Sequence, residues 1–180
     1  LDHTRLGDLK RAMQAVYDVA VVYGTPYISG KDSMYNDFSG YDEKGPVSIS
    51  IPPTLLITAI GVMKDIESTI SPDFKRSGDL IYLLGSTNAE LAGSEYSAMR
   101  SLEGSRTPNV DAKDNLKLYK AFEKANTNGL IASAISVTRG GLAAALLRSS
   151  IAGQLGAAVS FKNIQGDAKN LTEKLFSESQ

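Results

Sequence analysis

Four residues with the chemistry to bind phosphate stand together early in the chain: Gly30, Lys31, Asp32 and Ser33. Lysine supplies positive charge, and glycine lets the backbone approach an anion closely. A P-loop, however, needs two glycines separated by four residues, then lysine and a hydroxyl residue. Here five residues separate Gly24 from Gly30, and Asp32 stands where the hydroxyl belongs. We therefore reject a P-loop, and both a nucleotide-facing turn and a plain polar turn stay open.

A second candidate phosphate site comprises Arg139, Gly140 and Gly141, where a predicted strand runs directly into a predicted helix. The free amides and partial positive charge of a helix N-terminus attract anions. The guanidinium of Arg139 adds a fork of donors that suits phosphate. Junctions of this kind also occur as plain connectors, so that interpretation stays open.

Carboxylates near these junctions are candidate magnesium ligands. Glu90 and Glu95 lie in the glycine-containing junction 85–96, and Asp32 lies in the first one. Mg²⁺ is bound through oxygen ligands, often beside phosphates. Glutamate is also favoured at the start of a helix by the helix dipole, and aspartate is common in turns. The predicted metal set is Asp32, Glu90 and Glu95, with these structural interpretations as the alternative.

The hydrophobic pattern predicts the elements that position these residues. Helices are expected over 6–22, part of 89–103, 112–126 with Asp111 as cap, and from Gly140 to 153–156. Strands are expected over 26–29, 54–63, 80–84, 130–137 and 157–161, and a loop over 37–46. The pattern changes around 66–78, which predicts a domain boundary there.

Composition excludes several functional classes. The 180 residues carry a net charge of -1, which argues against a nucleic-acid or membrane-surface binder. There is no cysteine and only one histidine, His3, so thiolate chemistry and histidine-based metal sites are not expected. With no signal peptide and no apolar run of transmembrane length, we expect a cytoplasmic protein.

Five blocks in this order carry a resemblance to a known family: "GTPYISGKDSMYND", "IPPTLLITAIGVM", "SPDFKRSGDLIYLLGSTNAELAGSEY", "SVTRGGLAAAL" and "LFSESQ". Together they resemble the second half of the synthetase region of the phosphoribosylformylglycinamidine synthases, in the aminoimidazole-ribonucleotide-synthetase-like superfamily. The resemblance implies α/β and α+β architecture: part of an N-domain sheet over 1–68 and part of a C-domain over 69–180. Both domains are then incomplete, and we expect a piece of a longer protein.

The resemblance also implies an activity. Such ligases use ATP and Mg²⁺ to convert formylglycinamide ribonucleotide to formylglycinamidine ribonucleotide in purine biosynthesis, with ammonia from glutamine. Because the chain has no cysteine nucleophile, a separate glutaminase domain or subunit is the implied partner, together with a preceding homologous half. We expect the isolated chain to be inactive and to self-associate as a homodimer, and we expect its three glycine-bearing junctions to converge on one pocket.

Two departures bear on this expectation. The family reads Ser-Asp-Gly-Gly where this chain has Thr138 and Arg139 before its glycines, so a metal-binding carboxylate is replaced by a cation. Ala92 replaces a usual glycine. Two alternatives therefore stay open: a scaffold half with a degenerate nucleotide site, or another superfamily member such as aminoimidazole ribonucleotide synthetase, thiamine-monophosphate kinase or selenophosphate synthetase.

Overall fold

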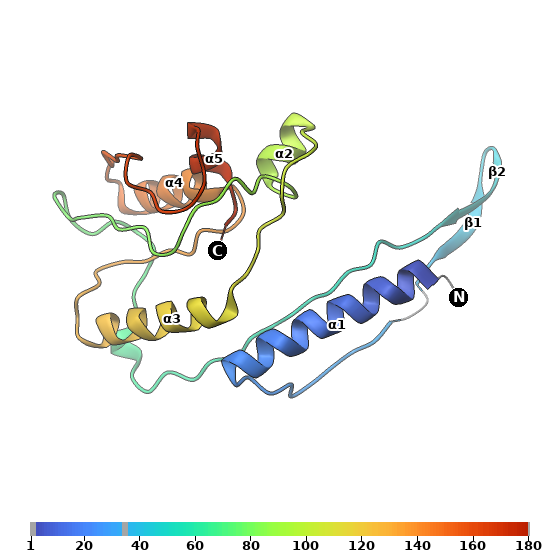
Figure 1. Cartoon of the computed structure of the whole chain (residues 1–180), viewed down its shortest axis with the longest axis horizontal. Coiled ribbons are helices and arrows are strands. Elements are labelled where there is room, and N and C mark those ends of the chain that lie inside the picture. The colour runs from blue at the N-terminus through green and yellow to red at the C-terminus, as the bar shows by residue number, and fades with distance from the viewer. Residues whose placement is uncertain (1–2, 34–35, 180) are drawn as a thin grey trace. The chain divides into compact units, whose positions relative to one another are not determined.

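The computed structural model describes residues 3–33 and 36–179 (Figure 1). It divides into two compact units, Leu1–Val62 and Met63–Gln180, called here the N-terminal and C-terminal units. The division falls close to the predicted boundary at residue 68, and the match of these units to family domains stays a prediction. Met34 and Tyr35 of the first glycine-bearing motif lie outside the described residues.

The N-terminal unit begins with helix α1 (His3–Tyr23), which confirms the helix predicted over 6–22. Gly24 ends it with φ +68°, a conformation that favours glycine, and the N–H of Thr25 donates to the carbonyl of Ala20 at 3.1 Å. None of the described residues of α1 is buried. Its apolar stripe, for example Met13 and Tyr17, therefore contributes little burial energy within this chain.

A β-hairpin occupies the segment for which the sequence predicts a loop, so that prediction is wrong. Strands β1 (Phe38–Asp42) and β2 (Gly45–Ile49) pair antiparallel, with Phe38 opposite Ile49. The Asp42 carboxylate accepts the N–H of Lys44 at 2.7 Å, and Gly45 adopts φ +127°. The Asp and Gly residues that suggested a mobile loop instead make the tight turn of the hairpin.

The five predicted strands, over 26–29, 54–63, 80–84, 130–137 and 157–161, are not formed in the part of the chain that the structure describes. Leu56 and Val62 are 88% and 94% exposed. A β-branched apolar run predicts an extended segment, but a strand also needs a hydrogen-bonded neighbour, which the run does not specify. Isolated bonds occur instead, such as the Ala134 N–H to the Ser71 carbonyl at 3.3 Å.

The C-terminal unit contains η1 (Ile66–Ser68), α2 (Glu95–Arg100), α3 (Ala112–Thr127), α4 (Gly141–Gly153) and α5 (Leu171–Phe176). Helices α2, α3 and α4 confirm the predicted helices of this region. Asp111 caps α3 as predicted, because its carboxylate accepts the N–H groups of Lys113 and Asp114. The sequence did not predict α5, which begins with a capping box between Asn170 and Glu173.

The core of the C-terminal unit is built on small residues of α4, which packs against α5. Gly141, Ala145 and Ser149 are its buried residues. The carbonyl of Ser149 accepts the N–H of Phe74 at 3.2 Å, and a Cβ on Gly153 would lie 2.3 Å from the Phe74 carbonyl oxygen. Small side chains thus allow backbone segments to touch the helix directly.

Helices with a small two-stranded sheet are compatible with the α+β part of the predicted fold class. The α/β N-domain sheet stays a prediction. Across residues 3–33 and 36–179, no helix is both long and apolar enough to cross a bilayer.

Candidate functional site

Two of the three predicted junctions meet in the C-terminal unit, and Glu178 joins them. Its Oε1 accepts the N–H of Gly140 at 2.8 Å and the N–H of Glu95 at 2.9 Å. Gly140 is the N-cap of α4, with φ +86°, and Glu95 is the first residue of α2. One carboxylate therefore caps the starts of both helices.

Arg139 and Glu95, both predicted site residues, form an ion pair. The Nε of Arg139 donates to Oε1 of Glu95 at 2.6 Å, and Nη2 contacts the same oxygen. Their side chains are 78% and 50% exposed, so the pair contributes less than about 1 kcal/mol to stability. The guanidinium predicted to bind phosphate is thus engaged by a carboxylate predicted to bind metal.

Gly141 serves packing in this structure. It is buried, with φ +65°, and a Cβ there would lie 2.6 Å from the carbonyl oxygen of Leu175 and 2.8 Å from that of Ser177. Glycine is required because the segment that follows α5 lies against the start of α4.

Glu90 is a buried carboxylate, only 4% exposed. Its Oε1 accepts the N–H of Asn109 at 3.2 Å, and its Oε2 accepts the Ser179 hydroxyl at 2.8 Å. Its own N–H donates to Oγ of Ser177 at 3.3 Å. Because burying an unpaired carboxylate is costly, these bonds explain how the chain accommodates it.

The segment 176–179, which reads Phe-Ser-Glu-Ser, binds the 88–96 block residue by residue. The ring of Phe176 stacks on Tyr96 with centroids 4.7 Å apart. Oγ of Ser179 accepts the N–H of Asn88 at 3.0 Å, and Ser177 and Glu178 make the contacts described above. Residues 176–179 contribute to the family resemblance, but none of them is a predicted site residue. Local periodicity gives no sign of partners this far along the chain.

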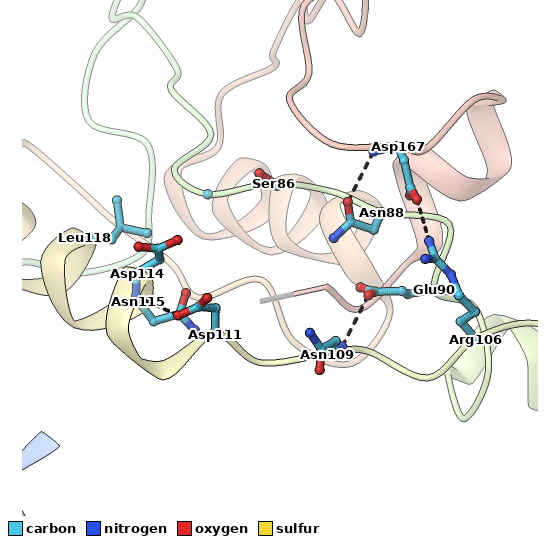
Figure 2. A pocket seen from close by; sticks show the side chains of 11 residues that line it. Ser86, Asn88, Glu90, Arg106, Asn109, Asp111, Asp114, Asn115, Leu118 and Asp167 are labelled. Carbon is cyan, nitrogen blue, oxygen red and sulfur yellow. Dashed lines mark hydrogen bonds and ion pairs between the residues drawn. The ribbon is translucent and has the colours of Figure 1, made fainter. Parts of the chain in front are cut away.

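A cavity of about 510 Å³ opens beside this block (Figure 2). Its wall includes Ser86, Asn88 and Glu90, the start of α3 and, from farther along the chain, Asp167. The Asp167 carboxylate accepts the N–H of Ala89 at 2.8 Å and Nη2 of Arg106 at 2.6 Å. These two bonds, the backbone one first, lower the pKa of Asp167 below its ordinary value.

The charge of the cavity disfavours phosphate. Its lining includes four carboxylates, those of Glu90, Asp111, Asp114 and Asp167. The lining also includes the guanidinium of Arg106, which already forms an ion pair with Asp167. Of the predicted site residues, only Glu90 reaches this lining. Polar groups that are neutral or cationic suit the cavity better than an anion does.

Gly30–Ser33 lies in the N-terminal unit, and all four residues are exposed. The ammonium of Lys31 donates to the carbonyl of Asp32 and to Oγ of Ser33, within its own turn. The convergence of this turn with the other two junctions stays a prediction.

The predicted metal set is not assembled in the C-terminal unit. Glu90 and Glu95 bind different partners, Asn109 and Ser179 for the former and Arg139 for the latter. Within the described ranges, no group of three or more His, Asp or Glu side chains is arranged to hold a metal ion. A magnesium role for Asp32, Glu90 and Glu95 stays a prediction.

Comparisons with known proteins cover most of the chain. A model of the AIR synthase related protein C-terminal domain matches residues 76–180. The phosphoribosylformylglycinamidine synthase subunit PurL of Renibacterium salmoninarum is 34% identical over 164 residues, which cover 91% of this chain and 20% of that protein. The chain thus spans about a fifth of the length of this relative. No solved structure matches.

Proposed function

The chain belongs to the AIR synthase related family through its C-terminal domain, and on that premise we propose that it forms part of a purine-biosynthetic ligase. The proposed ligase is ATP-dependent and converts formylglycinamide ribonucleotide to formylglycinamidine ribonucleotide with glutamine-derived ammonia. The observation that carries the proposal is the 34% identity to a PurL subunit across 91% of the chain.

The remaining parts of the proposed enzyme follow from its chemistry. Ammonia comes from a glutaminase domain or subunit, because a cysteine nucleophile is needed and this chain has none. A preceding homologous half supplies the other face of the cleft, and the enzyme works in the cytoplasm. The net charge of -1 gives no support for nucleic-acid or membrane binding.

ATP with Mg²⁺ is the cofactor of the proposed reaction, and the α4 junction does not fit it as it stands. The Gly140 N–H donates a hydrogen bond to Glu178, and the Arg139 guanidinium donates one to Glu95. We therefore derive no catalytic step at this junction. The exposed turn Gly30–Ser33 remains the candidate nucleotide-facing segment of the chain, because its lysine is accessible to a ligand.

A second candidate role inside the same ligase is that of a structural half. The observation that favours it is the Glu178 carboxylate, which fills the place where the sequence predicts a phosphate. In this role the chain orders the cleft of its partner half and turns over no nucleotide of its own.

The test uses the full-length protein that carries this chain, with ammonium as the nitrogen source. We expect ATP-dependent formation of formylglycinamidine ribonucleotide and of phosphate in equal amounts. Absence of the amidine product, or phosphorylation of a different substrate, contradicts the proposal.

Calorimetry on the same protein separates the two roles. If the half is structural, Arg139→Ala leaves the number of nucleotides bound per chain unchanged, as does the control Lys44→Ala in the hairpin turn. Loss of one bound nucleotide in Arg139→Ala assigns a working nucleotide site to this half. Lys31→Ala tests the turn at Gly30–Ser33 by the same measurement.

A further inference from the structure

Helix α4 receives its cap from a distant residue. Its N-cap, Gly140, has no side chain, and α4 has no side-chain cap of its own. The carboxylate of Glu178, 38 residues away in the sequence, accepts the Gly140 N–H at 2.8 Å. A carboxylate at this position is favoured both by the charge-assisted hydrogen bond and by the helix dipole.

The same oxygen also accepts the N–H of Glu95 at 2.9 Å. A phosphate at the α4 junction would need the Gly140 N–H and would bring a second negative charge against this carboxylate. Arg139, the cation that would attract the phosphate, already forms an ion pair with Glu95. Donor and charge are therefore both satisfied by the protein itself.

The backbone on either side of Glu178 is fixed. Ser177 and Ser179 are 1% and 7% exposed, and both hydrogen-bond to Glu90. The ring of Phe176 stacks on Tyr96. Opening the junction therefore requires the Glu178 side chain to rotate away while the segment that carries it stays in place.

We propose that Glu178 is an internal anion that closes the junction of Arg139, Gly140 and Gly141 to phosphate. It occupies the Gly140 N–H, one of the donors that the sequence predicts for a phosphate, and it holds the starts of α2 and α4 together. This inference goes beyond the proposed ligase, because it concerns what the junction binds and holds whichever reaction the parent protein catalyses.

The experiment titrates inorganic phosphate, and then pyrophosphate, into the full-length protein that carries this chain while the Gly140 amide is followed by NMR. The unmodified chain is expected to show no saturable shift of this amide. Glu178→Ala frees the N–H groups of Gly140 and Glu95, and we expect phosphate binding at least about tenfold tighter than in the unmodified chain, with a shift of Gly140. Glu123→Gln, a change of an exposed glutamate on α3, is the matched control and is expected to change nothing.

Glu178→Gln separates charge from geometry. Its amide oxygen can still accept the N–H groups of Gly140 and Glu95, so both hydrogen bonds are kept while the negative charge is lost. We expect a gain in phosphate affinity of a few fold, smaller than in Glu178→Ala. Should Glu178→Ala fail to fold, Glu178→Gln decides the question.

Two results overturn the inference. One is saturable phosphate binding at Gly140 in the unmodified chain as tight as in the variants. The other is a folded Glu178 variant whose phosphate affinity stays within twofold of the unmodified chain. Failure of the ligase proposal is distinguishable, because it appears as missing amidine product in the full-length protein and leaves this titration unaffected.

Discussion

Each of the two units is stabilised by its own internal contacts, and these differ in how far apart their residues lie in the sequence. In the described N-terminal unit, side-chain hydrogen bonds join near neighbours, such as Gln14 with Asp18, and Ile51 with Asp37, which are 14 residues apart in the sequence. In the C-terminal unit, the Asn88 N–H reaches the hydroxyl of Ser179, 91 residues away. The N-terminal unit therefore has mainly local contacts, and the C-terminal unit is stabilised by contacts between residues far apart in the sequence.

The difference shows that apolar sequence alone does not decide burial. The N-terminal unit carries the most strongly apolar run, yet Leu56 and Val62 in it are largely exposed. The buried set of the C-terminal unit is instead mostly polar and small, with Ala145 beside serines, Thr87 and Glu90. These polar groups are buried because each finds a hydrogen-bond partner, and among the described residues no buried side-chain donor or acceptor is left unpaired.

The largest expected effect comes from adding a methyl group at a closely packed glycine of the C-terminal unit, compared with the same change at an open glycine of the N-terminal unit. Gly153→Ala places a Cβ 2.3 Å from the Phe74 carbonyl oxygen, and we expect a loss of about 3 kcal/mol from the stability of the C-terminal unit. Gly61→Ala in the N-terminal unit meets nothing within 4 Å and is the matched control, with an expected change within about 1 kcal/mol. Denaturant unfolding of both variants measures the contrast, and equal effects would erase it.

A smaller effect is expected from the buried carboxylate. Glu90→Ala leaves the N–H of Asn109 and the hydroxyl of Ser179 without their acceptor, and we expect a loss of about 2 kcal/mol. Glu90→Gln should lose less, because its amide oxygen still accepts one of these bonds. Glu43→Ala, in the exposed hairpin turn, is the control for the other unit. Thermal unfolding tests this, and a stable Glu90→Ala variant would mean that water replaces the carboxylate.

The smallest expected effect is a pH dependence that arises from Asp73 in the C-terminal unit. Hydrogen bonds from Lys75 and then Ser71 lower the pKa of Asp73 from 3.8 to about 2. Because the folded pKa lies below the unfolded one, this stabilisation is complete above about pH 4 and is lost as the pH falls toward 2. The side chain is solvent-accessible, so the effect is small and salt-sensitive.

An NMR titration of the Asp73 carboxyl group measures this pKa directly, and Asp73→Asn should remove that part of the pH dependence of unfolding. A carboxyl group that titrates near 4 would contradict the prediction.

Local sequence determined the parts of the structure that depend on near neighbours. The Asp111 cap of α3, the end of this helix close to residue 126 and the start of α4 at Gly140-Gly141 are all predicted from the sequence, because caps and helix periodicity act over a few residues. The hairpin was missed although its turn is local, because Asp and Gly occur both in loops and in tight turns.

Only the tertiary structure decided what the site residues do. The sequence identified Arg139, Gly140, Glu90 and Glu95 as notable, but their partners, Asn109, Glu178 and Ser179 among them, lie 19 to 89 residues away. Which carboxylate binds an amide or a guanidinium depends on how the chain closes, and periodicity carries no information about that closure. For the same reason, the strands predicted from apolar runs are not formed in the described residues, because such a run does not specify its hydrogen-bonding partner.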